Sequence, residues 1–249
     1  MKRITSIKQI SSNKYSIVID NKKHIVYDDV LLQYHILKAG EITDEAYDSI
    51  IKSNNYYEGY NKSLKYILAK QRTEKEIREK LHKLLVSKED IQKIIERLYE
   101  EKYLDDEKYI QSYIHDEISL KLTGYNKIYS SLIKLGFDSF LVTKYLSKVE
   151  EDIWKNKAKV IYQKFSKKAH NLSKKMFEIK LHKHFIELGY DEKYYSSLLK
   201  ENNYDEQESL KKEYDKLYNK YSKKYEGEKL DYFIKQKLYQ KGYNVSNLD

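Results

Sequence analysis

The chain has 249 residues, no Cys, no Pro and a formal net charge of +9 at pH 7. This length is enough to bury a hydrophobic core, and the lack of Cys excludes disulfides and Cys-ligated zinc sites. The longest apolar run, residues 66–69, is far too short to span a bilayer, and no apolar segment follows the N-terminal residues as in a secretory signal. We therefore expect a soluble, cytoplasmic protein that does not bind membranes.

The N-terminal module, residues 1–60, is predicted to contain strands. β-Branched runs suggest strands over residues 7–10, 15–19 and 24–27, and a polar Asp-Asn turn at residues 20–21 joins the last two as a hairpin. The module carries eight basic and eight acidic residues, so it is neutral and the positive charge lies further along the chain. The sequence thus predicts a small three-stranded module.

Two helices are expected after these strands. Asp28 or Asp29 is placed to cap a short helix over residues 30–39, which Gly40 would end by adopting the left-handed conformation. Thr43 is placed to cap the helix that follows. With no Pro and only 7 Gly in the whole chain, helices are expected everywhere beyond this point.

After residue 60 the apolar residues recur with the 3.6-residue period of amphipathic helices, and the pattern itself repeats every 51 to 53 residues. A Gly-aromatic pair recurs in the repeats, and we interpret it as the end of a helix. The Gly ends the helix in the left-handed conformation, the aromatic residue packs back on the last turn, and another helix follows. These Gly-aromatic pairs are Gly136-Phe137, Gly189-Tyr190 and Gly242-Tyr243. A helix upstream of each pair makes three helices per repeat.

The predicted fold is mainly α, an elongated array of tandem three-helix repeats behind the β-hairpin-containing N-terminal module. The four repeats are assigned to residues 61–103, 104–149, 150–204 and 205–249. The fourth is truncated, as at the end of an array, because residues 245–248 are too few for a full third helix. No heptad pattern calls for a dimer, so we expect a monomer.

Short motifs in the first two repeats resemble the RecX family, whose members also carry tandem three-helix repeats. One motif is an Arg-Ser-Glu-type helix start, a second is a Tyr-Leu-Asp-Asp-type junction, and a third lies in the second repeat. The matching residues are Arg72, Thr73, Glu76, Tyr103, Leu104, Asp105, Asp106, Gly124, Ile128, Leu132 and Gly136.

Two positions depart from the family pattern. Thr73 stands where Ser is usual, but its hydroxyl can still cap a helix and form a capping box with Glu76. Lys102 replaces the small residue, often Gly, that usually precedes the Tyr-Leu-Asp-Asp stretch. The resemblance implies a regulator without catalytic residues or cofactors, which binds the RecA filament on single-stranded DNA and usually inhibits strand exchange and co-protease activity in DNA repair and recombination.

The sharpest electrostatic feature is a lysine-rich segment in the third repeat, opposed by Glu178 alone. Such a patch is typical of a surface that binds the phosphates of single-stranded or duplex DNA, and it would serve equally well on an acidic protein surface. The alternative is a face that is merely solvated. Trp154, Tyr162 and Phe165 interleave with it, either as core or as contacts to nucleic acid. The ten lysines are Lys155, Lys157, Lys159, Lys164, Lys167, Lys168, Lys174, Lys175, Lys180 and Lys183.

No residues stand out as catalytic or metal-binding. Asp105 and Asp106 precede a predicted helix, where a cap and the helix dipole account for two acids. His182 and His184 are about 200° apart around a helix, so they cannot share one ion. The chain has no phosphate-binding glycine loop and no nucleophile elbow. We expect no enzyme activity, no metal and no cofactor.

Two other functions remain open. Residues 73–85 and 88–99 could form a helix-turn-helix of a sequence-specific DNA-binding regulator, although Ile91, Ile94 and Leu98 favour packing over base recognition. A protein scaffold would bind its partner independently of salt. A tyrosine stripe in the fourth repeat is interpreted as core, with base stacking as the alternative; it comprises Tyr214, Tyr218, Tyr221 and Tyr225.

Overall fold

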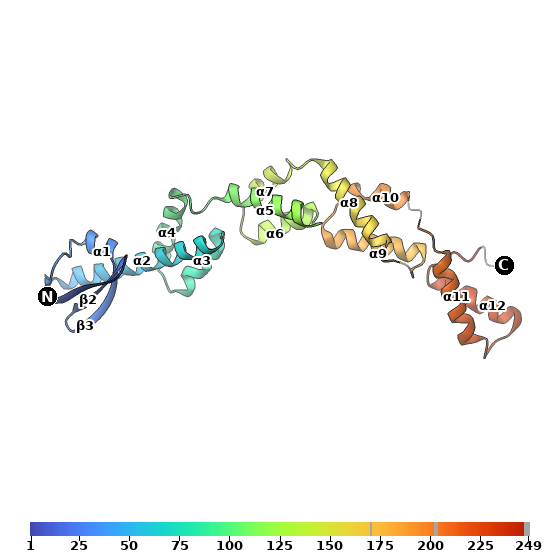
Figure 1. The fold of residues 1–249 in the computed structure, drawn as a ribbon, viewed down its shortest axis with the longest axis horizontal. Coiled ribbons are helices and arrows are strands. Elements are labelled where there is room, and N and C mark those ends of the chain that lie inside the picture. The colour runs from blue at the N-terminus through green and yellow to red at the C-terminus, as the bar shows by residue number, and fades with distance from the viewer. Residues whose placement is uncertain (170, 202–203, 247–249) are drawn as a thin grey trace. The chain divides into compact units, whose positions relative to one another are not determined.

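The computed structural model describes residues 1–169, 171–201 and 204–246 (Figure 1). It separates into two compact units, Met1–Tyr109 and Ile110–Asp249, which are described one at a time. No helix in the described part of the chain combines the length and apolarity needed to cross a membrane. The fold is mainly α with tandem helical repeats, as predicted.

The N-terminal module is a four-stranded antiparallel sheet of β1 (Lys2–Ser11), β2 (Lys14–Ile19), β3 (Lys22–Tyr27) and β4 (Gly40–Ile42), in the order β3-β2-β1-β4. The predicted hairpin is confirmed: Asp20 and Asn21 both have positive φ, 44° and 63°, as a two-residue turn between twisted strands requires. The prediction of three strands was wrong, because β4 forms a fourth.

The predicted helix over residues 30–39 is also corrected. The helix α1 (Asp28–Gln33) is shorter, and Tyr27 occupies its N-cap without a side-chain bond, so neither aspartate caps it. The left-handed residue after it is His35, with φ 52°, whereas Gly40 pairs with Ile4 of β1. The pairing partner lies 36 positions earlier in the chain, so a local pattern could not reveal it.

The long helix α2 (Asp44–Ala69) begins at Thr43, whose hydroxyl accepts a hydrogen bond from the Ala46 N–H at 3.1 Å, as predicted. Ile50 packs in the core of the sheet, whereas Tyr60 and Ile67 pack with the next two helices. The helix is therefore continuous across residue 60, where the sequence suggested a boundary.

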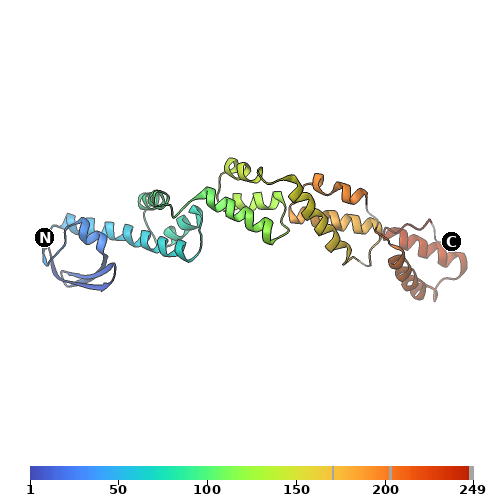
Figure 2. The same ribbon diagram turned by 45° about the horizontal axis from the view of Figure 1, so that its top comes forward.

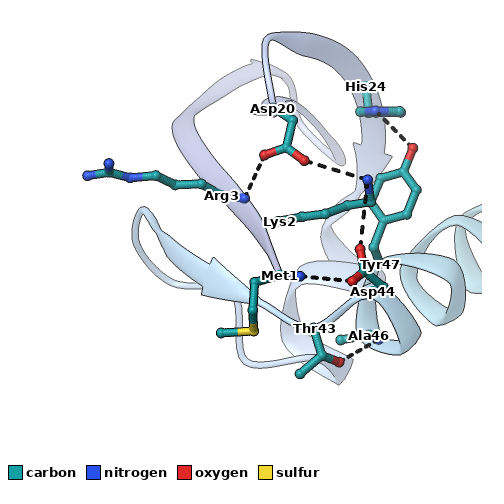
Figure 3. A network of polar contacts seen from close by, with 9 residues as sticks. All are labelled: Met1, Lys2, Arg3, Asp20, His24, Thr43, Asp44, Ala46 and Tyr47. Carbon is teal, nitrogen blue, oxygen red and sulfur yellow. Dashed lines mark hydrogen bonds and ion pairs between the residues drawn. The ribbon is translucent and has the colours of Figure 1, made fainter.

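Polar contacts tie the start of β1 to the start of α2 (Figure 3). The α-amino group of Met1 lies 2.8 Å from the Asp44 carboxylate. The Lys2 ammonium lies 3.5 Å from Asp20 and 4.7 Å from the centre of the Tyr47 ring. The sheet and the helix are thus joined at their edge as well as through the core.

The helices of the repeats follow in order. With the second half of α2, the first repeat contains α3 (Glu74–Lys83) and α4 (Lys88–Glu100). The second contains α5 (Asp106–Leu120), α6 (Tyr125–Lys134) and α7 (Ser139–Leu146). The third contains α8 (Glu151–Ser166), α9 (Lys174–Leu188), the 3-10 turn η1 (Glu192–Tyr194) and α10 (Ser196–Lys200). The fourth, as far as it is described, contains α11 (Gln207–Tyr221) and α12 (Gly227–Gln240).

The predicted glycine turns are confirmed. Gly136, Gly189 and Gly242 have φ of 98°, 83° and 84°. The N–H of each following aromatic residue donates to the carbonyl five positions back, at 3.0 to 3.3 Å. In the first repeat Leu85, with φ 57°, takes the glycine position, and Val86 makes the equivalent bond to Leu81 at 3.2 Å. Four turns therefore share one helix-ending geometry.

Within the second unit these turns also join consecutive repeats. Gly189, which ends α9, contacts Gly124, the N-cap of α6, and the Gly124 N–H donates to the Leu188 carbonyl at 2.7 Å. Gly242, after α12, lies against Ser173, the N-cap of α9, whose hydroxyl donates to the Lys241 carbonyl at 2.8 Å. The carbonyls left over at one helix end thus meet donors at the start of another.

Candidate interaction surfaces

The first RecX-like motif forms a structural clamp at the start of α3. The capping box is confirmed: Glu76 N donates to the Thr73 hydroxyl at 3.2 Å, and Thr73 N donates to the Glu76 carboxylate at 3.0 Å. The Arg72 guanidinium pairs with Glu76 at 2.9 Å and lies 3.8 Å from the centre of the Tyr66 ring in α2. These contacts fix α3 against α2, so the motif has a structural role.

The second motif caps α5. Leu104 is buried, and the Asp105 carboxylate accepts from Lys108 N at 2.9 Å, as expected of a helix cap. The hydroxyl of Tyr99 lies 2.9 Å from both Asp106 and Glu74, so one hydroxyl connects carboxylates of α5 and α3. Burial raises the pKa of the Asp106 carboxyl, although the hydrogen bond from Tyr99 opposes this.

The turn before this motif keeps its tight geometry despite Lys102. This residue has φ 60°, the left-handed conformation that favours Gly. Its neighbour Tyr103 donates its N–H to the Leu98 carbonyl at 2.9 Å and is 39% exposed. The departure from the family pattern is thus accommodated by strain in the backbone, without a change in the turn.

The ten lysines lie on α8, on α9 and in the turn between them, and nine of them are exposed. The exception is half-buried Lys157, whose ammonium donates to the Lys121 carbonyl at 2.7 Å and whose pKa is lowered by burial. Lys155 and Lys183 form ion pairs on their own helices. The other exposed lysines of the segment form no ion pair among the described residues; they are Lys159, Lys164, Lys167, Lys168, Lys174, Lys175 and Lys180.

The lysines do not form one stripe. At about 100° per residue, Lys155 and Lys159 fall on one side of the buried face of α8, and Lys157 and Lys164 fall on the other. The structure does bring two of them together: Lys168, just after α8, and Lys180 of α9 line one surface cavity. Helices α8 and α9 lie side by side in both views of the ribbon (Figures 1 and 2).

The three interleaved aromatic residues differ in environment. Trp154 is 1% exposed and meets Tyr125 and Tyr190 edge to face, so it is core. Tyr162 is half-buried and packs on Phe177 of α9. Phe165 also contacts Phe177, but it lines the cavity with Lys168 and Lys180. Trp154 lines another cavity, beside Lys193, whereas Phe165 lines the one that two lysines of the segment share.

Most of the tyrosine stripe of α11 is core. Tyr214, Tyr221 and Tyr225 pack against the buried cluster that includes Ile234 and Leu238 of α12. Tyr218 is 46% exposed and stacks on Tyr214 at 6.3 Å between ring centres. The interpretation as core is confirmed for three of the four rings.

The outer face of α4 does not favour base recognition. Buried Ile91, Ile94 and Leu98 occupy its inner side, as the sequence suggested. The exposed amide of Gln92 is engaged by Arg78 at 2.8 Å and by Glu96 at 2.8 Å. Of the residues the structure describes, no three His, Cys, Asp or Glu side chains are grouped to hold a metal ion.

Comparisons with known proteins agree on one family. A model of the RecX first three-helix domain matches residues 60–98. The Regulatory protein RecX of Streptococcus mutans is 30% identical over 248 residues, covering 97% of this chain and 95% of that protein. The protein of the same name from Streptococcus sanguinis is 28% identical over 232 residues, covering 92% and 90%.

Two solved structures share the fold. A crystal structure of a regulatory protein RecX has a TM-score of 0.70 at 23% identity and covers 81% of this chain and 100% of its own. A crystal structure of RecX from Lactobacillus salivarius has a TM-score of 0.56 at 22% identity and covers 60% and 97%. The helical-repeat fold of this chain is therefore also found in these two solved structures.

Proposed function

This chain belongs to the RecX family, and from that premise we propose that it is a non-enzymatic regulator that binds the RecA filament on single-stranded DNA. We propose further that it inhibits the recombinase, ATPase and co-protease activities of the filament. The observation that carries the proposal is the similarity to a relative named Regulatory protein RecX along 97% of the chain. The link to RecA is what membership of this family implies.

The surface of the third repeat supports a binding role. The unpaired lysines of α8, α9 and their turn offer positive charge to phosphates or to acidic protein surface. In our proposal consecutive repeats each add a contact to the filament, so individually weak contacts accumulate. In this mechanism the protein occupies the groove of the filament and hinders the addition of RecA subunits or the entry of duplex DNA.

The test is RecA-dependent ATP hydrolysis on single-stranded DNA, measured with and without a substoichiometric amount of this protein, together with sedimentation of the filament. We expect hydrolysis to fall and the protein to sediment with the filament. If hydrolysis is unchanged and the protein stays in the supernatant, the proposal is wrong. Sequence-preferring binding to naked duplex DNA in the same experiment would instead favour the helix-turn-helix function.

A further inference from the structure

The cavity between α8 and α9 has the features of a small ligand site. Its volume is about 310 Å³, close to the lower end of the range for ligand clefts, roughly 300–1,000 Å³. It is lined by Phe165, Lys168, Ala169, Asn171, Leu172 and Lys180. Among the described residues, the lining therefore combines an aromatic ring, an aliphatic wall, one side-chain amide and two cations, and none of these lining residues is acidic.

The wall of the cavity is held in place from outside. The Leu172 carbonyl accepts hydrogen bonds from the Ser209 hydroxyl at 2.8 Å and from the Tyr204 hydroxyl at 3.1 Å. The Tyr204 ring stacks on Phe177 with 4.3 Å between ring centres, and Phe177 in turn contacts Phe165. The Leu172 and Phe165 sides of the cavity are thus held by the protein's own contacts, which lowers the entropy cost of binding a ligand there.

This chemistry matches one nucleotide of a single strand. An unstacked base offers a flat apolar surface to an aromatic ring, and its edge carries donors and acceptors that an amide can meet. Lys168 and Lys180 form no ion pair within the described part of the chain. The phosphates on either side of the base would give each of them a negatively charged partner. A duplex would not suit the cavity, because its bases are already stacked and paired.

We propose that this cavity receives one unstacked base of single-stranded DNA, with Phe165 as the contacting ring and Lys168 and Lys180 on the flanking phosphates. The inference deepens the proposed function, since it rests on contact with the DNA of the filament. It assigns this role to half-buried Phe165 and not to Trp154, which is 1% exposed.

The experiment measures fluorescence anisotropy of a labelled oligothymidylate and of an oligonucleotide with the same number of phosphates but with abasic sites. The wild-type chain should bind the abasic strand roughly tenfold more weakly, a loss in the range expected for one stacked base. Phe165→Leu keeps an apolar side chain at this position but removes the ring. It should bind the intact strand roughly tenfold more weakly and no longer distinguish the two strands.

Matched variants separate the base from the phosphates. Phe140→Leu makes the same change at a ring that is 79% exposed and lies outside the lysine-rich segment, and it should bind like wild type. Replacing Lys168 and Lys180 by Gln should make the slope of log affinity against log salt less steep by about 1.4, at about 0.7 per phosphate contact.

Equal binding of the intact and abasic strands by the wild-type chain would overturn the proposal, and this comparison needs no variant. Equal affinity for duplex, or competition by polyglutamate as strong as that by the oligonucleotide, would also overturn it. In each of these cases the RecA assay still reports on the proposed function. If the wild-type chain does not inhibit the RecA filament but still prefers the intact strand to the abasic one, the proposed regulatory function is wrong and the base-binding cavity stands.

Discussion

The carbonyl oxygen of Gly189 accepts a hydrogen bond from the backbone N–H of Asn126 at 2.9 Å. This bond joins the end of α9 to the first turn of α6, where helices have donors without partners of their own. The approach is so close that a Cβ on Gly189 would overlap the backbone nitrogen of Lys127. The junction between the second and third repeats therefore depends on a glycine.

Gly189→Ala should lower the free energy of unfolding by about 2–5 kcal/mol. The left-handed backbone accounts for about 1–2 kcal/mol and the overlap with Lys127 for about 1–3 kcal/mol. Gly227→Ala is the matched control, because Gly227 also has positive φ, 57°, but a Cβ there would meet nothing within 4 Å. Urea denaturation followed by circular dichroism measures both, and equal losses would contradict the role of the junction.

Lys102→Gly should stabilise the protein. The left-handed conformation at φ 60° costs a non-glycine residue about 1–2 kcal/mol, and Gly removes this cost. The greater conformational freedom of Gly in the unfolded chain cancels about half of the stabilisation. A net increase of about 0.5–1 kcal/mol is expected in urea denaturation. Lys93→Gly, in the exposed face of α4, should instead destabilise by about 1 kcal/mol. A loss at Lys102 would mean that its side chain contributes contacts of its own.

Reversing the charge of Lys167, Lys168, Lys174 and Lys175 to Glu should abolish filament binding. The control reverses four exposed lysines of α11, which changes the net charge by the same amount; they are Lys211, Lys212, Lys216 and Lys220. Sedimentation with RecA filaments measures both, after circular dichroism has shown that the helices are intact. If both variants bind equally, the third repeat is not the contact surface.

Salt dependence tests the same surface without a variant. If six of its lysines contact phosphates, the log of the affinity for single-stranded DNA should fall with the log of salt concentration with a slope of about −4. Titrations at several ionic strengths provide the slope. A value near zero would point to a protein scaffold, whose partner binding does not depend on counterion release.

The stability contributed by Asp106 should decrease as pH rises. Because burial raises its folded-state pKa above the ordinary value of about 3.9, the folded protein holds a proton that the unfolded chain has lost between the two values. The free energy of unfolding should therefore fall through this window and stay lower above it, in comparison with Asp106→Asn.

The Tyr99 hydroxyl is the internal check on this prediction. Its hydrogen bond lowers the pKa of Asp106, so Tyr99→Phe should raise that pKa further and make stability fall more steeply with pH. Urea denaturation across the acid range compares wild type with both variants. A pH dependence that is the same in all three would show that Asp106 does not titrate within this range.

Features determined by neighbouring residues could be predicted from the sequence. The capping box of Thr73 and Glu76, the hairpin turn at Asp20 and the left-handed glycines depend on hydrogen bonds and backbone conformations spanning only a few positions. The tandem repeats were also visible, because an amphipathic helix carries its period in the order of its residues. The family resemblance depended on such local motifs.

Features that depend on distant residues were decided by the tertiary structure. Gly40 forms a strand because β1 offers it a partner, although its own neighbours resemble the end of a helix. Lys157 donates to the Lys121 carbonyl just after α5, and the turn that lines the cavity beside Phe165 is held by Tyr204 and Ser209. The order of residues determines which side chains are available, but packing between elements determines which of them remain exposed to bind a partner.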